Sequence, residues 1–454
     1  MFETYGNLSR AELQLAVGRI RPLFMRYAMP GVIAMLFMAL QGIVDGLIVG
    51  RFLGAKALAA VNIASPVYTF ATAIALIIGV GSQAQIGLNL GAGEYTKAKT
   101  ALRSGLTGLM VFSIVSALFV NLIADSLVRV LGADDELVET SSGYVYGLMP
   151  WLVGLAASLF FDYILKALGQ PRFAMTVMVS TIIINIFLSI LFVGKMGMGT
   201  FGAGMGTGVS FSLGAIVSGL TCYNRIRNNR NLYKARSRFS LKELGYIFYN
   251  GSSEGLTEIA LGFTMFLFNI TLMKYVGSDG VAAFTIVGYL VFVGVSVALG
   301  VSNGVIPIIS YNYGAGLITR VKRVILMALG VNTVFGIFFA LILWLGGRSI
   351  VCLFIDTTDT DVIELATTGA RFMAMAFLFN GINIFAASYY TAIDRPSMSL
   401  VVASLRSIIF LTAGILLLPQ YFGVDGIWAT TLIAEILTLV VVCIIFKYTR
   451  IQTK

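Results

Sequence analysis

The sequence contains no histidine, few cysteines and few charged residues of either sign. Only 11% of its 454 residues are charged, whereas about 25% are charged in soluble domains. Because histidine is absent, any proton transfer by the protein would depend on carboxylates. Cys222, Cys352 and Cys443 lie far apart and fit neither a disulfide framework nor a metal motif. We expect them to act as small packing residues, and we predict no metal site and no cofactor.

Apolar residues make up 58% of the chain, and 49 glycines accompany them. An apolar helix of about 20 residues spans a bilayer, and glycine permits close helix packing there. We therefore predict an all-α integral membrane protein with twelve transmembrane helices. The approximate cores are 28–50, 58–81, 104–124, 143–166, 173–194, 201–222, 247–273, 281–306, 324–345, 368–391, 398–418 and 427–446.

The net charge of +10 is unevenly distributed along the chain. With twelve spans and a cytoplasmic N-terminus, the inner segments hold 23 of the 31 Lys and Arg residues, as the positive-inside rule requires. The outer loops collect acidic residues instead, for example in "DTTDTD" at 356–361, which is expected to be a solvated loop. This pattern favours a multi-pass cell-membrane protein with both termini cytoplasmic, and it argues against a nucleic-acid partner.

The second half of the chain repeats the first at a shift of 223 residues, which later drifts to 224 or 225. "GVGSQAQIGLNLGAG" at 79–93 aligns with "SNGVIPIISYNYGAG" at 302–316, and Gly54, Ala59 and Ala60 align with identical residues. Each half holds six spans, an even number, so both halves enter the membrane in the same direction. Parallel repeats of this kind, facing each other across a cleft, are typical of alternating-access carriers.

The predicted domains follow from this duplication. Residues 1–27 form an interfacial N-terminal helix, with Leu13, Ala16, Val17 and Ile20 at helical spacing. Residues 28–222 form the first lobe and 247–446 the second. A basic cytoplasmic linker at 223–246 joins the lobes, and 447–454 is a cytoplasmic tail.

Motifs along nearly the whole chain carry a family resemblance. They are Pro30 and Asp45 in span one, then "GLNLGAGEYTKAK", "ALGQP", "GTFGAGMGTGVS", "NYGAG" and "LLPQYFGVDGIWAT". In this order and spacing the sequence resembles the multidrug and toxic compound extrusion (MATE) family, in particular its MepA-like and DinF-like branches. The resemblance implies two six-helix lobes in a V shape, and export of amphipathic, mostly cationic drugs driven by inward proton or sodium movement.

Asp45 is an isolated carboxylate in the apolar run "FMALQGIVDGLIVGRFLG". An intramembrane acid is costly and is functional by default, and low-dielectric surroundings favour its protonated form. Gln41, one turn away, shares its helix face. The resemblance implies that Asp45 is the coupling residue and that Asn185 and Thr207 surround it. Where the family often has a second aspartate, this chain has Ser189, which favours protons over sodium because hard cations prefer carboxylate ligands.

The 223-residue shift places Asp45 on Phe268, beside the neutral Asn269, so the two lobes are predicted to differ chemically. The second lobe instead offers Glu254 and Glu258, which share a helix face. Two such carboxylates either favour protonation of one or jointly attract a cationic substrate. In the NorM branch of the family a span-seven glutamate is functional, but it would lie about one turn deeper than Glu258. The further substrate-binding candidates are Asn269, Asn380, at the place of that branch's span-ten aspartate, and Glu435.

Four intramembrane charges are interpreted by the partners that they would find. Asp162 and Lys166 are four residues apart and are expected to neutralise each other. Arg406 lies deep in span eleven and needs a partner or a carbonyl cage, at a lobe interface or in a functional site. Glu435, in span twelve, would pair with a drug cation or with polar groups of the other lobe.

Together these features predict a drug:proton antiporter, with sodium as the alternative ion, that acts as a monomer on organic cations within the lipid bilayer. It is not expected to be an enzyme. One alternative is a lipid-linked oligosaccharide flippase of the same superfamily, which would line its cleft with basic groups for a diphosphate. Another is a membrane-embedded transferase, which would need clustered acids for a metal or a positioned base; the chain shows no such cluster.

Overall fold

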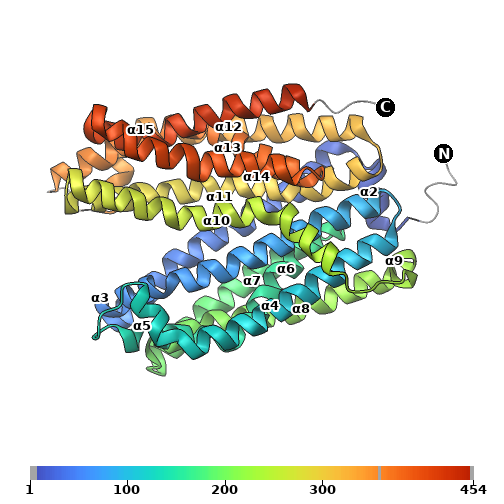
Figure 1. Ribbon diagram of the computed structural model, residues 1–454, viewed down its shortest axis with the longest axis horizontal. Helices are drawn as coiled ribbons and strands as arrows, with labels where there is room; N and C mark the ends of the chain where they lie inside the picture. Colours follow the sequence, from blue (N-terminus) through green and yellow to red (C-terminus); the bar gives the residue numbers. More distant parts are fainter. Residues whose placement is uncertain (1–7, 356–358, 450–454) are drawn as a thin grey trace.

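The structure, a computed structural model, describes residues 8–355 and 359–449, and all regular elements in this part of the chain are helices. The helices of the first half and those of the second half form separate groups, coloured blue to green and yellow to red in Figure 1. Residues 356–358 of the predicted acidic loop lie outside the described part. The predicted all-α membrane fold is confirmed.

The first lobe consists of long helices and one interrupted span. Its elements are α3 (Ile20–Gly91), α4 (Tyr95–Val130), α5 (Val138–Leu148), the 3₁₀ turn η1 (Met149–Trp151), α6 (Leu152–Ala167), α7 (Pro171–Ser189), the π-helical η2 (Ile190–Lys195) and α8 (Gly199–Asn228). The second lobe consists of α10 (Leu241–Tyr275), α11 (Ser278–Gly314), α12 (Ile318–Val351), α13 (Thr360–Ala392), α14 (Pro396–Ser404), the π-helical η3 (Leu405–Ile409) and α15 (Phe410–Tyr448). Two short helices, α2 (Arg10–Val17) and α9 (Arg230–Lys234), lie outside the lobes in sequence.

Within the described residues, ten helices are long and apolar enough to cross a membrane. Two of them contain two passes each. The 72-residue α3 turns at Gly54, where φ is 85°, and the last helix turns at Gly423, where φ is 57°. These left-handed conformations suit glycine because it has no Cβ. The count therefore agrees with the twelve predicted spans.

The repeat is visible in the backbone as well as in the sequence. Four residues with positive φ in the first half have counterparts with similar φ in the second. The pairs are Gly54 and Gly277 (85° and 91°), Gly93 and Gly316 (73° and 71°), Gly169 and Asp394 (80° and 65°), and Gly199 and Gly423 (62° and 57°). Asp394 is the only non-glycine residue with positive φ in the described ranges. At these four places the two lobes therefore use similar helix connections.

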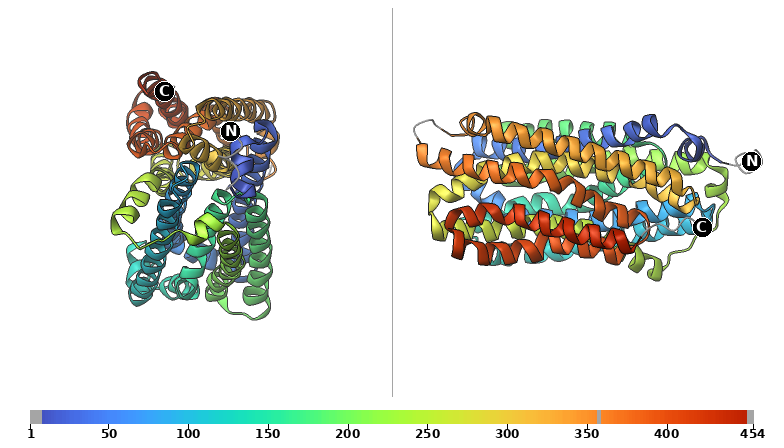
Figure 2. Two further views of the ribbon diagram at one scale, coloured as in Figure 1. Left: turned by 90° about the vertical axis from the view of Figure 1, so that its right-hand side faces the viewer. Right: turned by 90° about the horizontal axis from the view of Figure 1, so that it is seen from above.

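The lobes touch most closely at the end of the molecule where α2 and the end of α15 lie, which we call the terminal end (Figures 1 and 2). A Cβ on Gly31 of α3 would overlap the carbonyl oxygen of Gly300 of α11, and one on Gly91 would overlap that of Tyr311. Glycine thus allows direct contact between backbones of the two lobes. The terminal end is closed by this packing.

Asp394 adds hydrogen bonds to the same closure. Gln85 Nε2 of α3 donates to Asp394 Oδ1 at 2.6 Å, and the Tyr246 hydroxyl of α10 donates to the same oxygen at 2.9 Å. The Gln85 bond joins the first lobe to the second across 309 residues of sequence. Hydrogen bonds to a charged acceptor are stronger than neutral ones, so this contact stabilises the closed terminal end.

The N-terminal helix and the linker differ from their predicted descriptions. Helix α2 begins with a Ser9–Glu12 capping box. It buries Leu15 inside the protein, although Leu15 was not one of the residues of the predicted apolar face. Arg320 Nη2 of α12 donates to the Leu15 carbonyl at 2.9 Å, and this hydrogen bond joins α2 to the second lobe. Residues 20–27 already belong to α3. Helices α8, α9 and α10 take up most of 223–246, leaving only a short connection at 235–240.

Candidate functional site

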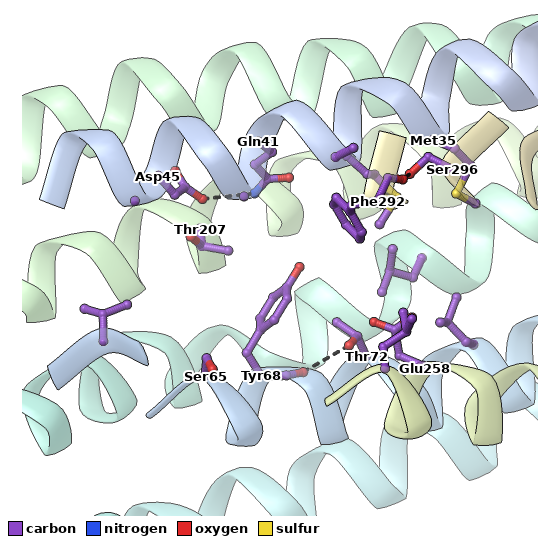
Figure 3. A pocket seen from close by; sticks show the side chains of 18 of the residues that line it. Met35, Gln41, Asp45, Ser65, Tyr68, Thr72, Thr207, Glu258, Phe292 and Ser296 are labelled. Atoms are coloured by element: carbon purple, nitrogen blue, oxygen red, sulfur yellow. Dashed lines mark hydrogen bonds between the residues drawn. The ribbon is translucent and has the colours of Figure 1, made fainter. Parts of the chain in front are cut away.

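A cavity of about 320 Å³ lies between the lobes, and both lobes contribute to its walls. Its polar wall includes Asp45 from the first lobe and Glu254 and Glu258 from the second, and Tyr68, Tyr144 and Tyr163 also line it. Figure 3 shows Asp45, Gln41 and Thr207 on one side and Glu258 on the other, with Tyr68 reaching between them. Among the described residues that line the cavity, none is Lys or Arg. The cavity is therefore acidic.

The structure brings together the cluster that the sequence analysis placed around Asp45. Gln41 Nε2 lies 3.5 Å from Asp45 Oδ2. In the amide orientation that satisfies its neighbours, Asn185 Nδ2 donates to Asp45 Oδ1 at 3.1 Å, while its Oδ1 accepts from Thr207 Oγ1 at 3.2 Å. Ser189 lies beside Asn185, one turn further along α7. Asp45 is half-buried, whereas its four neighbours are buried.

Three helices of the first lobe position this cluster. Asp45 and Gln41 lie on α3, Asn185 and Ser189 on α7, and Thr207 on α8. The glycines around Thr207 let α8 approach closely, since a Cβ on Gly204 would overlap the Tyr144 carbonyl oxygen. The π-helical η2 begins directly after Ser189, and such irregular turns are frequent at functional sites. All partners of Asp45 are neutral, so the cluster holds one carboxylate.

Glu254 and Glu258 face the cavity from α10, one turn apart, as their spacing predicted. Glu254 Oε1 accepts a hydrogen bond from Ser388 Oγ at 3.0 Å, and Ser388 Oγ lies 3.2 Å from Asn303 Oδ1. Glu258 is less buried than Glu254 and points toward the interior of the cavity (Figure 3). The two acids thus differ: one is held by the second lobe and the other faces open space.

Arg406 and Glu435, whose partners the sequence left open, pair with each other inside the second lobe. Arg406 Nε donates to Glu435 Oε1 at 2.8 Å, and the two side chains are 12% and 4% exposed. Asn380 Nδ2 donates to Glu435 Oε1 at 2.7 Å and Asn383 Nδ2 to Oε2 at 2.7 Å. The expectation that Glu435 pairs with polar groups of the other lobe is therefore wrong, since its partners lie in its own lobe.

Three of the five substrate-binding candidates are not among the residues that line the cavity, namely Asn269, Asn380 and Glu435. Asn269 is half-buried, and its Oδ1 has no hydrogen-bond partner within the described ranges. Arg406 does not line the cavity either. The basic lining that a diphosphate would require is missing from the described walls, so the structure gives no support to a flippase.

Asp162 and Lys166 form the ion pair that their spacing predicted, and both are buried in α6. Tyr163 lies between them in sequence and lines the cavity; Lys166 Nζ is 5.0 Å from the centre of its ring. The pair thus lies next to a lining residue but does not itself line the cavity, which is consistent with a structural role. Of the three cysteines expected to act as small packing residues, Cys222 is buried, Cys352 is half-buried and Cys443 is exposed.

Sequence reasoning did not find the aromatic and neutral residues of the cavity. Tyr68, Tyr144, Tyr163 and Phe292 line it, yet the chain has 19 Tyr and 32 Phe residues, and composition cannot separate lining residues from core or lipid-facing ones. Asn62 and Asn303 carry a usable signal, because each is an amide in a largely apolar stretch of its helix. The signal from Asn303 is the one that leads to α13. The helix neighbours of Asn303 did not indicate that it would meet Ser388 of α13.

The fold and the cavity define a multi-pass membrane protein in which two repeated helix bundles enclose an acidic cavity. The chain belongs to the MatE family, whose model matches residues 30–191 and 255–415, more than half of the chain and one match in each lobe. Among curated proteins it is similar to "Multidrug export protein MepA" of Staphylococcus aureus, 26% identical over 418 residues, and to that of Staphylococcus haemolyticus, 24% identical over 414 residues. Each match covers 90% of this chain and 90% of the relative.

Solved structures show the same fold. The structure called "Outward-facing conformation of a multidrug resistance MATE family transporter of the MOP superfamily" superposes with a TM-score of 0.89 at 20% sequence identity. The match covers 97% of this chain and 98% of that one. The predicted MATE resemblance is thereby confirmed.

Proposed function

We propose that the protein is a secondary active multidrug efflux antiporter that exports amphipathic, mostly cationic compounds in exchange for protons. The observation that carries this proposal is the cavity itself, in which carboxylates of both lobes face one space that no described lysine or arginine lines. Such a space attracts cations, and its tyrosines and methionines suit varied apolar groups. The names of the Staphylococcus relatives, multidrug export proteins, support the direction and the breadth of transport.

Asp45 would be the coupling group of this antiporter. It is the one carboxylate in its cluster, and its neighbours Gln41, Asn185 and Thr207 bring no charge that would hold it permanently ionised. A proton can therefore neutralise it when it is not facing a cation. Sodium would gain only one anionic ligand here, because Ser189 supplies a hydroxyl, whereas hard cations favour several oxygen ligands with negative charge.

Alternating access would follow from rearrangement at the terminal end. By the positive-inside rule this end would lie in the cytoplasm, so the closed form would bind protons and release drug on the outer side. Opening the cytoplasmic side requires the glycine contacts between α3 and α11 to part and the Gln85–Asp394 hydrogen bond to break. The protein would act as a monomer, since each chain contains both lobes and the whole cavity.

Dye efflux from proteoliposomes, with proton and sodium gradients imposed separately, tests this proposal. We expect a proton gradient to drive export of a cationic dye and a sodium gradient of equal size to have no effect. Transport driven by sodium alone would replace the proposed ion. Absence of transport under both gradients, from protein that elutes as a single folded species, would overturn the antiporter itself.

A further inference from the structure

The segment between the lobes presents a basic surface at the terminal end. Residues 225–242 contain no acidic residue. All seven of their basic side chains are exposed: Arg225, Arg227, Arg230, Lys234, Arg236, Arg238 and Lys242. A segment with this charge would extend into solvent if it were unrestrained, because like charges repel. Its contacts with the first lobe show that it does not.

Side chains of α4 hold the segment against the first lobe by hydrogen bonds to its backbone. Lys99 Nζ donates to the carbonyl oxygens of Tyr233 and Ala235 at 2.7 and 2.9 Å. Arg103 Nη1 donates to the Ser237 carbonyl at 3.0 Å. At the far end, the Ser240 backbone N–H donates to Ser104 Oγ at 3.0 Å. The segment therefore follows the first turns of α4, at the level where the apolar part of that helix begins.

Because these hydrogen bonds hold the backbone of the segment against α4, its basic side chains are directed toward solvent. Between α9 and α10, Lys234, Arg236 and Arg238 are exposed, whereas Ala235 and Ser237, between them, are half-buried. Alternation with a period of two is the property of an extended backbone. The exposed apolar side chains of Tyr233, Phe239 and Leu241 lie among the basic ones. We call residues 233–242 the linker strip.

We propose that the linker strip binds the anionic phospholipid headgroups of the membrane leaflet at the terminal end. Its basic groups match the phosphate charge, and its exposed apolar side chains match the boundary between headgroups and acyl chains, where amphipathic segments with this composition bind. Its position beside the start of α4 places both kinds of side chain at that depth. The strip would thereby anchor the first lobe to the leaflet surface, a role separate from the transport cavity.

The experiment compares lipid retention by three forms of the full-length protein, purified into nanodiscs that contain phosphatidylcholine and phosphatidylglycerol. The test variant is Arg236→Gln/Arg238→Gln/Lys242→Gln. The matched control is Lys195→Gln/Lys274→Gln/Arg348→Gln, which removes the same charge from exposed residues at the opposite end. All six positions are exposed, so both variants should fold, and size-exclusion elution checks this. Native mass spectrometry then counts the lipids that remain bound.

We expect the wild type and the control to retain phosphatidylglycerol in preference to phosphatidylcholine, and the linker variant to lose this preference by roughly tenfold. Added salt should weaken the preference in the wild type, because exposed charges are screened. Equal retention by the linker variant and the wild type would overturn the proposal. So would a wild type that binds a soluble polyanion such as heparin but shows no preference between the two lipids, since the surface would then recognise a soluble partner.

Discussion

The two lobes share one backbone plan, but Asp45 of the first lobe and Glu435 of the second are in opposite situations. In the first lobe, Asp45 faces the cavity with only neutral partners. In the second lobe, Glu435 is enclosed and neutralised by Arg406. The position that corresponds to Asp45 by the repeat is Phe268, which is fully buried and stacks on Phe284 with ring centres 4.7 Å apart. Duplication thus supplied two similar scaffolds, and their side chains differ: the first lobe has a carboxylate with neutral partners where the second has a buried phenylalanine.

The difference has a physical consequence. In a buried, hydrogen-bonded ion pair, removal of one partner leaves an unpaired charge in a low-dielectric interior. A lone carboxylate at a cavity wall can exchange its proton or its counter-ion. We therefore expect substitution of Asp45 to affect coupling and substitution of Arg406 or Glu435 to affect stability.

The largest expected effect is on transport, from Asp45→Asn. The amide oxygen can still accept from Asn185, although its NH2 group replaces the oxygen that faced Gln41 Nε2. Because the amide cannot take up and release a proton, proton-driven dye efflux from proteoliposomes should fall to the level of protein-free vesicles. The free energy of unfolding should change by less than about 1 kcal/mol, because the side chain is half-buried and similar in size. Full proton-driven efflux by this variant would remove Asp45 from the mechanism.

Next in size is the loss of stability from Arg406→Met, which leaves Glu435 charged and unpaired. We expect about 3–5 kcal/mol of destabilisation, measured as a lower thermal midpoint in detergent. The double variant Arg406→Met/Glu435→Gln should recover most of this loss, because no buried charge remains and the new amide oxygen can still accept from Asn380. A single variant as stable as the wild type would show that the pair does not hold the second lobe together.

A smaller effect is expected at the contact between the lobes. Gln85→Leu removes the hydrogen bond to Asp394, worth roughly 1.5–3 kcal/mol for a charged acceptor, and should favour opening of the terminal end. Labelling of a cysteine introduced on the α3–α11 contact would report this as faster reaction. Gln83→Leu, two residues away, is the matched control, because the Gln83 side chain is buried and has no hydrogen-bond partner in the described residues. Equal labelling of the two variants would contradict the assignment of Gln85 as a closing contact.

The smallest effect is expected from Ser189→Asp, which adds a second carboxylate one turn from Asn185. The extra anionic ligand should make dye efflux respond to a sodium gradient, which the wild type should not do. Ser189→Asn, a neutral change of the same size, serves as the control. If the wild type already responds to sodium as strongly as Ser189→Asp, the lone carboxylate does not explain ion choice.

Much of this architecture could be predicted from the chain. The spans, their duplication and the grouping of Asp45, Gln41, Asn185 and Thr207 follow from apolar length, internal similarity and family motifs, and the described helices agree with the first two. The pairing of Arg406 with Glu435 could not be predicted, because each residue taken alone had several possible partners. The lining of the cavity by Tyr68 and Phe292 was equally out of reach, since aromatic residues occur on every face of the helices.

The sequence by itself determined which segments cross the membrane, because the hydrocarbon layer accepts only helices whose backbone groups are hydrogen-bonded. It also determined that the two halves differ in their intramembrane charges, because hydrocarbon tolerates few charged residues. Asp162 and Lys166 could be paired from their spacing, but the tertiary structure alone decided which charges are compensated between different helices. Arg406 and Glu435 lie 29 residues apart, and Gln85 and Asp394 lie 309 apart, distances over which helical periodicity carries no information. Partners from different helices meet only through packing, and in this protein packing leaves Asp45 at the cavity wall while it encloses Glu435.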